Sequence, residues 1–485
     1  MASIQQVNTE RIVMRYIQTR YSKTNAKLKA LFVAAGLFST TASASGIDGE
    51  WKATIQTESD KVLPIVLHID QDNGKWTGVL DSPSQKTYGI EMSSLEVIGN
   101  NISFEIEDLG LSYEGAYNPV VELMFGSFTQ GKSLSLNFRK INTVQPENRP
   151  QTPTGPYPYT IEEVSFKSTI TNNIISGTLT KPNSRIKATA ILISGSGPQD
   201  RDETAFGHKA FAVIADYLTR QGYAVLRYDE RGIGDSTGSF STATTEDFAN
   251  DTSAIVDYLN SRNDLPKGKT GLIGHSEGGM IAPMVASNRD DIAFTILLGG
   301  PGVKLQELFF DQWHRDRKHS GVTEKNLQEL RKLDKIIFEQ FAHLPIGGTI
   351  SDELHQYLYK TVELEGLEGG KLEAQVEVLK KQYSTPWFRY ALSFNPEPYL
   401  EGTKCPILAL NGSLDFQVDA EMNLGNIEKV LGKSNHKDYE IIELDKMNHL
   451  FQTAETGSYA EYAEIEETFS PIALETMSIW LNERF

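Results

Sequence analysis

The chain has 485 residues, of which 39% are hydrophobic and 23% are charged. This length and composition exclude a disordered or collagen-like chain and predict two or three globular domains. Lysine and arginine number 46 against 64 aspartates and glutamates, so the net charge of −18 argues against binding to nucleic acids or anionic membrane surfaces.

The first 44 residues have the pattern of a secretory signal peptide. Lys27 and Lys29 precede the apolar run Ala30–Phe38, and an A-x-A cleavage motif follows at Ala42–Ala44. The apolar run is much shorter than the ~20 residues that a transmembrane helix needs. We therefore expect cleavage near Ala44 and export to the periplasm or the medium.

Residues 45–143 are predicted to form a small all-β domain, either an antiparallel barrel or a sandwich. Leu63–Ile69 and Lys75–Leu80 flank Asn73-Gly74, a dipeptide typical of tight hairpin turns. Asn101–Ile106 and Ser133–Phe138 alternate apolar and polar residues, which indicates strands with one buried face.

A proline-rich segment at residues 144–158 separates this domain from the rest of the chain. Closely spaced prolines favour an extended, semi-rigid backbone, so we interpret the segment as a linker. A long surface loop within one domain is the alternative. The prolines are Pro146, Pro150, Pro153, Pro156 and Pro158.

Residues 159–485 alternate apolar strands with helical segments, which predicts an α/β domain with a mostly parallel sheet. A helix-rich stretch at residues 303–403 interrupts the alternation and is expected to form a lid over the site. Within it, apolar residues recur every three or four positions from Leu327 to Phe341, as on one face of a helix. The predicted strands are Ala188–Ile193, Ala224–Tyr228, Thr270–Ile273, Phe294–Leu298, Ile407–Leu410 and Tyr439–Leu444.

The sequence Gly274-His275-Ser276-Glu277-Gly278 matches the G-x-S-x-G pattern of a nucleophile elbow. The motif alone is weak, but here a predicted strand leads into it and a predicted helix leads out of it. This strand–turn–helix context exposes a serine above the sheet and directs helix N–H groups towards a developing oxyanion. Ser276 is therefore the candidate nucleophile.

A serine hydroxyl needs a base, and His449 is the candidate because it follows the strand Tyr439–Leu444 near the C-terminus. In α/β-hydrolases the acid lies between the serine and the histidine in the chain. Asp415 fits this order because it follows the strand Ile407–Leu410. Asp419 and Asp445 are the competing acids, although Asp445 lies so close to His449 in sequence that a local capping role is expected.

The oxyanion hole is expected to combine the N–H of Glu277 with an N–H from the loop that follows Ala188–Ile193. That loop reads Ser194-Gly195-Ser196-Gly197-Pro198. Pro198 has no N–H to donate, so Ser196 and Gly197 are the candidates.

The sequence predicts no cofactor and no metal. Cys405 is the single cysteine, which excludes an internal disulfide and a cysteine-based zinc site. The glycines after Ala188–Ile193 do not complete a dinucleotide-binding motif, because Asp200 stands where the third glycine belongs. We interpret the turn Asp229–Ser236 as structural.

Five blocks in this order resemble the bacterial α/β-hydrolase-fold serine esterases of the EstD type. The resemblance spans about residues 159–485 and implies a carboxylesterase with the triad Ser276, Asp415 and His449 and a helical lid. Residues 46–140 resemble the β domain that precedes the hydrolase domain in exported members. The blocks are SGSGPQDRDE at 194–203, YDERGIGDS at 228–236, GHSEGG at 274–279, NGSLDFQV at 411–418 and NHLFQ at 448–452.

The predicted reaction is hydrolysis of short-to-medium acyl esters through an acyl-enzyme, with Trp387, Phe388 and Tyr390 as candidate acyl-pocket residues beneath the lid. Packing within the lid is the alternative for these aromatic residues. Two other functions stay open: an amidase or peptidase of the acylaminoacyl type, and an exported binding protein with a vestigial hydrolase domain. The expected partner is a small ester, and the sequence leaves open whether the chain forms a homo-oligomer.

Overall fold

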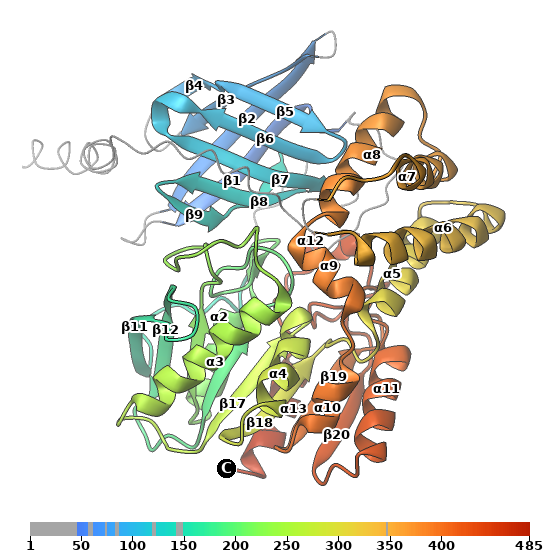
Figure 1. The fold of residues 1–485 in the computed structure, drawn as a ribbon. Helices are drawn as coiled ribbons and strands as arrows, with labels where there is room; N and C mark the ends of the chain where they lie inside the picture. The colour runs from blue at the N-terminus through green and yellow to red at the C-terminus, as the bar shows by residue number, and fades with distance from the viewer. Residues whose placement is uncertain are drawn as a thin grey trace, which may run out of the picture.

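The computed structural model describes residues 46–56, 62–72, 75–82, 87–118, 123–141, 149–345 and 348–485. It contains a β domain followed by an α/β domain (Figure 1). The predicted leader with its cleavage site at Ala44, the Asn73-Gly74 turn and the part of the proline-rich segment around Pro146 lie outside the described residues. Within the described ranges, no helix combines the length and hydropathy that a membrane span requires.

The β domain is one antiparallel sheet with the strand order β4-β3-β2-β1-β10-β8-β7-β6-β5, and β9 pairs with β8. The Met92 N–H donates to the Gly78 carbonyl (3.0 Å), so the connection between β4 and β5 closes back on β3. The sheet encloses its own core around Trp51, Phe104 and Phe138, which are buried. The bounds are β1 Gly49–Gln56, β2 Val62–Asp72, β3 Lys75–Ser82, β4 Thr87–Glu91, β5 Ser94–Ile98, β6 Asn101–Ile106, β7 Leu111–Asn118, β8 Leu123–Gln130, β9 Lys132–Ser135 and β10 Phe138–Lys140.

The strand predicted over Ser133–Phe138 is interrupted at Leu136 and Asn137, which divide it into β9 and β10. β9 pairs with β8 alone, whereas β10 pairs with both β8 and β1. Both strands pair with β8 in one register, with Ser135 opposite Ser127 and Phe138 opposite Met124, so the chain keeps its direction through the interruption. Leu136 and Phe138 are both buried, so the apolar pattern was the same as that of a single strand.

The second sheet has the order β11-β12-β16-β13-β17-β18-β19-β20. The strands from β13 onwards are parallel, and β12 joins β11 and β16 in antiparallel pairs. This is the α/β-hydrolase fold, as predicted, and the antiparallel β11–β12 pair is an addition that the apolar-run pattern did not reveal. The bounds are β11 Tyr159–Lys167, β12 Ile174–Pro182, β13 Thr189–Ile193, β16 Ala224–Tyr228, β17 Thr270–His275, β18 Ile292–Leu298, β19 Ile407–Gly412 and β20 Tyr439–Leu444; β14 Thr204–Ala205 and β15 His208–Lys209 form a separate small sheet.

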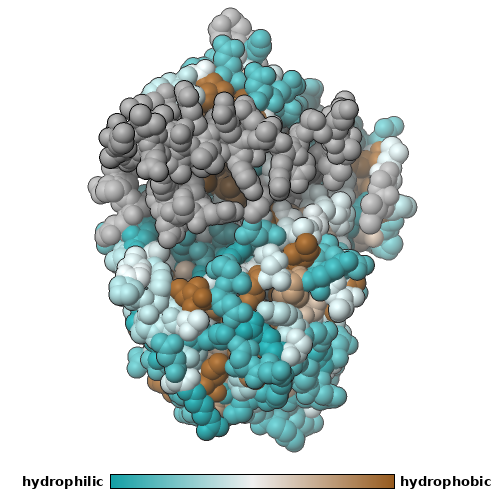
Figure 2. Space-filling model, turned by 90° about the vertical axis from the view of Figure 1, so that its left-hand side faces the viewer, coloured by the Kyte–Doolittle hydropathy of each residue, from teal (hydrophilic) through white to brown (hydrophobic). Residues whose placement is uncertain are grey.

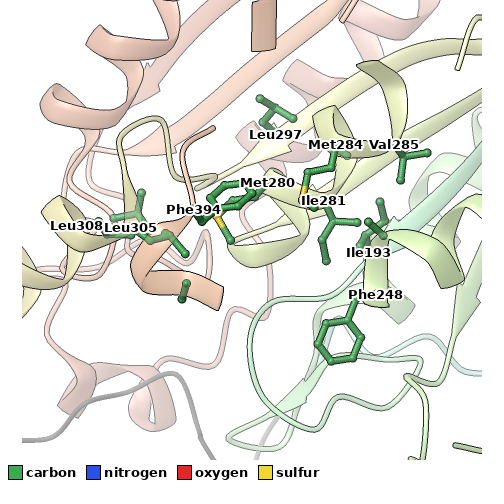
Figure 3. Packing of buried hydrophobic residues seen from close by; sticks show 14 of the residues in the cluster. Ile193, Phe248, Met280, Ile281, Met284, Val285, Leu297, Leu305, Leu308 and Phe394 are labelled. Atoms are coloured by element: carbon green, nitrogen blue, oxygen red, sulfur yellow. The ribbon is translucent and has the colours of Figure 1, made fainter. Parts of the chain in front are cut away.

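Both faces of this sheet are buried, which explains the continuous apolar strands. In β13, Ile191 and Ile193 face one core, and Ala190 and Leu192 face the other. Figure 3 shows the first core, where residues of α4 such as Met280 and Ile281 pack beside the sheet. The helices that flank the sheet are α2 Ala210–Arg220, α3 Thr245–Ser261, α4 Glu277–Ser287, α11 Ala420–Lys433 and α13 Pro471–Asn482, and the short α12 Tyr459–Glu464 lies between β20 and α13.

The stretch between β18 and β19 is helical, as predicted. Leu327, Leu330 and Ile337 are buried along one face of α6, which confirms the periodicity of that segment. The buried Arg317 guanidinium of α5 pairs with Asp334 of α6 and, at 2.8 Å, with Glu365 after α7, so one cation joins three elements. The insertion contains α5 Leu305–His319, α6 Glu324–His343, α7 Asp352–Leu364, α8 Gly369–Tyr383, α9 Pro386–Ser393 and α10 Glu397–Gly402.

The β domain lies against the α/β domain, beside helices α7 and α8 of the insertion (Figure 1). The Gly234 N–H donates to the Ser133 carbonyl (2.7 Å), and the rings of Phe125 and Phe206 meet edge to face at 5.0 Å between centroids. The described part of the proline-rich segment also packs against the α/β domain. There the Arg149 guanidinium donates to the carbonyls of Phe206, Ala463 and Ile465 at 2.8, 2.8 and 3.1 Å.

Figure 2 shows the face of the molecule that is on the left in Figure 1. Its visible part is mostly hydrophilic, and apolar residues form small separate groups rather than one continuous patch. The large exposed apolar side chains include Ile161 of β11 and Ile174 of β12. Scattered residues of this kind are ordinary on a protein surface and indicate no docking site.

Candidate active site

Ser276 stands in a strained turn between β17 and α4. Its φ of +52° lies in the left-handed region, which a non-glycine residue adopts only when its surroundings impose it. A Cβ at Gly274 would lie 1.9 Å from the Gly278 carbonyl oxygen, and a Cβ at Gly278 would lie 2.1 Å from the Ile193 carbonyl oxygen. Both glycines are therefore required for the close approach of backbone segments that forms the elbow.

The structure pairs His449 with Asp415, two residues that are 34 positions apart. His449 Nδ1 lies 2.8 Å from Asp415 Oδ2, and both side chains are almost completely buried. The other carboxylate oxygen accepts the N–H groups of Gln417 and Val418, both at 2.8 Å. These bonds fix the carboxylate and leave Nε2 of the imidazole for another partner.

The two competing acids have other roles in the structure. Asp419 caps helix α11, where its carboxylate accepts the Met422 N–H at 2.8 Å. The Asp445 carboxylate accepts a long bond of 3.5 Å from the Ser413 hydroxyl. Of the three candidates, Asp415 is therefore the one that contacts the His449 imidazole.

The loop after β13 passes directly beside Ser276. A Cβ at Gly195 would lie 3.1 Å from Ser276 Cβ, and the Gly195 N–H already donates to Glu203 Oε1 at 2.7 Å. This use of the Gly195 N–H leaves Ser196 and Gly197 as the oxyanion candidates of this loop. Glu277 begins helix α4, so its N–H belongs to the first turn, whose donors have no intrahelical acceptor.

A second imidazole–carboxylate pair lies beside the first one, and no motif or spacing in the sequence indicated it. His275 Nδ1 lies 2.9 Å from Glu203 Oε1, and His275 Nε2 lies 2.9 Å from the His449 carbonyl oxygen. Both partners offer an acceptor oxygen, so the arrangement suits an imidazole ring that donates from both nitrogens. Burial alone would lower the pKa of His275, but the Glu203 carboxylate and its hydrogen bond outweigh this and raise it.

The side chain of Glu277 ties the elbow to three other parts of the domain. Glu277 Oε1 accepts the Thr245 hydroxyl of α3 at 2.7 Å and the Trp387 indole N–H of α9 at 2.8 Å. The Ser196 side chain is a third hydrogen-bond partner of this carboxyl group. Burial raises the pKa of Glu277, and these three hydrogen bonds oppose the shift.

Two cavities meet at Ser276. The larger, of about 150 Å³, is lined by Ser276, His449 and His275 and extends to the β domain. The smaller, of about 50 Å³, lies beneath the helical insertion and is lined by Ser276, Glu277, Trp387 and Phe388. Tyr390, the third predicted pocket residue, instead packs against Phe394 with ring centroids 6.0 Å apart.

No group of three or more histidine, cysteine, aspartate or glutamate side chains within the described ranges is arranged to hold a metal ion.

The turn Asp229–Ser236 is hydrogen-bonded to the loop that carries the oxyanion candidates. Glu230 of this turn accepts the Ser194 hydroxyl at 2.8 Å and the Gln199 N–H at 3.1 Å. Burial raises the pKa of Glu230 well above its usual range, and the carboxyl group faces this loop rather than the cavity.

Comparisons with known proteins agree with the resemblance seen in the sequence. Residues 208–337 match the family model "Hydrolase_4: Serine aminopeptidase, S33". Esterase EstD of Thermotoga maritima is 24% identical over 292 residues, which are 60% of this chain. The match spans 61% of the length of that relative.

Solved structures with similar folds include an esterase of Pyrococcus furiosus and Est1E of Butyrivibrio proteoclasticus with bound ferulic acid. The first is 17% identical, has a TM-score of 0.42, and covers 70% of this chain and 98% of its own. The second is also 17% identical, has a TM-score of 0.39, and covers 66% of this chain and 98% of its own. The strand order of the second sheet is that of the α/β-hydrolase fold, and the sequence of this domain is similar to that of an EstD-type esterase.

Proposed function

We propose that the protein is a serine carboxylesterase that hydrolyses short-to-medium acyl esters through an acyl-enzyme on Ser276. The observation that carries the proposal is the meeting of a strained serine and an imidazole–carboxylate pair in one cavity. Similarity to an esterase over 60% of the chain supports the same reaction.

In the proposed reaction, His449 removes the Ser276 proton as the serine oxygen attacks the ester carbonyl. The Asp415 carboxylate holds the imidazole in the tautomer that accepts this proton at Nε2 and stabilises its charged form. The N–H groups of Glu277 and of Ser196 or Gly197 stabilise the oxyanion. His449 then protonates the departing alcohol, and it later activates the water that releases the acid.

The experiment is a hydrolysis panel on purified protein, with p-nitrophenyl esters from acetate to octanoate and one aminoacyl-anilide. We expect the wild type to hydrolyse the acetate and butyrate esters. We expect Ser276→Ala to fold normally and to have a turnover rate lower by at least ~10⁴-fold. Full turnover in Ser276→Ala would refute the proposed nucleophile. Preference for the anilide would instead indicate an amidase, and failure to react with a fluorophosphonate would indicate a vestigial hydrolase domain.

The helical insertion is proposed to act as a lid over the smaller cavity, with Trp387 and Phe388 in its lining. The Trp387 indole packs near Phe309 and bonds to Glu277, so it links the insertion to the elbow. Trp387→Ala is expected to extend the chain-length preference towards longer acyl groups, whereas Trp387→Phe keeps a ring and serves as the control. An unchanged chain-length profile in Trp387→Ala would count against this role.

Export is proposed from the leader pattern alone. Expression of the full chain in a bacterial host, followed by fractionation and N-terminal sequencing, tests it. We expect mature protein outside the cytoplasm with a new N-terminus directly after Ala44. Uncleaved protein confined to the cytoplasm would contradict the proposal.

A further inference from the structure

The two cavities at Ser276 have different walls. The smaller cavity is lined by Met280 of the elbow helix α4 and by apolar residues of the insertion, including Leu308 and Phe309. The larger cavity has three times the volume and is lined on one side by His449 and Leu450. Ser276 lines both, so an ester whose carbonyl carbon is at Ser276 would place one part in each cavity.

The far wall of the larger cavity belongs to the β domain. Phe125 of β8, Ser135 at the end of β9 and Asn137 in the break between β9 and β10 all line it. The edge-to-face contact between Phe125 and Phe206 and the Gly234–Ser133 hydrogen bond hold this wall against the α/β domain. The break that ends β9 therefore lies at the cavity.

The chemistry of the proposed reaction decides which part of the ester occupies which cavity. The alcohol oxygen must receive a proton from the imidazole as it leaves, so the alcohol lies on the His449 side of Ser276. His449 lines the larger cavity. The acyl chain then extends to the other side, along Met280 and beneath the insertion.

We propose that the β domain is part of the leaving-group site and selects the alcohol portion of the ester. This inference rests on the proposed esterase function and adds a role for a domain that contributes no triad residue. The β domain contributes the aromatic ring of Phe125 and the polar side chain of Asn137 to this cavity, and Phe206 and Tyr459 of the α/β domain add further rings to its lining. A ring-bearing alcohol with one further polar substituent is the class that this lining would take, because rings pack well on aromatic edges.

The first test compares alcohols at a constant acyl group. Ethyl butyrate and 2-phenylethyl butyrate are hydrolysed by wild type, Phe125→Ala, Asn137→Ala and the control Tyr88→Ala, whose side chain is 63% exposed on β4 of the same domain. We expect Phe125→Ala to lower kcat/KM for the phenylethyl ester about tenfold relative to the ethyl ester, with a smaller effect in Asn137→Ala. Tyr88→Ala is expected to leave the ratio unchanged.

The second test uses the step in which the alcohol is absent. Deacylation of the butyryl-enzyme by water is expected to keep its rate constant in Phe125→Ala, because the alcohol has already left. Transfer of the butyryl group to added 2-phenylethanol, which must bind where the alcohol leaves, is expected to fall relative to hydrolysis. An effect on deacylation equal to that on acylation would overturn the assignment.

These outcomes separate the inference from the function on which it rests. Suppose that Phe125→Ala and Asn137→Ala react with a fluorophosphonate but have the same ratio of kcat/KM for the two esters as Tyr88→Ala. This result would overturn the role of the β domain and leave the esterase function intact. Wild type that neither reacts with the phosphonate nor hydrolyses either ester would overturn both. If Phe125→Ala does not fold, Asn137→Ala decides, because Asn137 is only half-buried.

Discussion

Two imidazole–carboxylate pairs lie side by side at Ser276, and they differ in what the second ring nitrogen faces. The bond lengths are nearly equal, 2.8 Å for His449–Asp415 and 2.9 Å for His275–Glu203, and the two rings are 4.8 Å apart. His275 uses its other nitrogen to hold the His449 backbone carbonyl, whereas His449 keeps Nε2 for a reacting group. The same chemical pair can therefore support catalysis or position a loop, and the remaining hydrogen bond decides which.

The His275–Glu203 pair also connects the two halves of the site. Glu203 Oε1 accepts the Gly195 N–H of the oxyanion loop, and His275 holds the loop that carries His449. Glu203 has a φ of +49°, so its backbone is held in an uncommon conformation to present this carboxylate. We interpret the pair as a positioning unit that fixes the distance between oxyanion donors and base.

The largest loss of activity is expected from changes to the His449–Asp415 pair, in which Nε2 of His449 is kept for the reacting group. His449→Ala removes the base and should lower kcat for p-nitrophenyl butyrate by ~10⁴-fold or more, and Asp415→Asn should cost a factor of about 10³ to 10⁴. Steady-state kinetics measure both, and circular dichroism confirms the fold. A His449→Ala variant with turnover within tenfold of wild type would show that the wrong histidine has been identified.

Changes to the His275–Glu203 positioning pair should lower activity by a smaller factor. His275→Ala releases the His449 carbonyl, and a misplacement of this kind costs up to about 10²-fold in kcat. Ser276 should still react with a fluorophosphonate, at a reduced rate. A loss as large as that of His449→Ala would mean that His275 takes part in proton transfer, and the distinction between the pairs would fail.

The conservative change Glu203→Gln tests whether charge or shape matters in the positioning pair. Glutamine keeps an oxygen for the Gly195 N–H but removes the charge that faces His275. We expect a loss of about tenfold in kcat with little change in KM. A change in KM alone would instead indicate that Glu203 contacts the substrate.

The smallest expected effect is on stability. The pKa of His275 is raised in the folded protein, so its stabilising contribution is complete below its ordinary pKa near 6.5 and is lost as pH rises through the folded-state value. The difference in unfolding free energy between wild type and His275→Ala should therefore be larger at pH 6 than at pH 9. Urea unfolding at both pH values measures this difference, and a difference that grows with pH would contradict the raised pKa of His275.

The sequence was sufficient to predict the elements that follow simple patterns. β16, β6 and β20 have the predicted bounds because each is a short run with one clear apolar pattern. The placing of Ser276, Asp415 and His449 at strand ends followed from chain order. Their meeting in space is a consequence of parallel strands that all end at the same edge of the sheet.

Other features carried no local signal. β11 and β12 form an antiparallel pair in which Ile161 is exposed, so β11 lacks the continuous apolar run of the central strands. The His275–Glu203 pair joins residues 72 positions apart through a loop with unusual backbone angles. The wall that Phe125 and Asn137 form depends on how two domains dock, which no periodicity within either domain encodes.

The most direct test of the central claim is to trap the covalent intermediate. Wild type is mixed with p-nitrophenyl butyrate, quenched in acid within the first turnover, digested and analysed by mass spectrometry. We predict one butyryl group on the peptide that carries Ser276 and none in Ser276→Ala. Release of p-nitrophenol without any acyl group on this peptide, or with the group on another residue, would contradict the account.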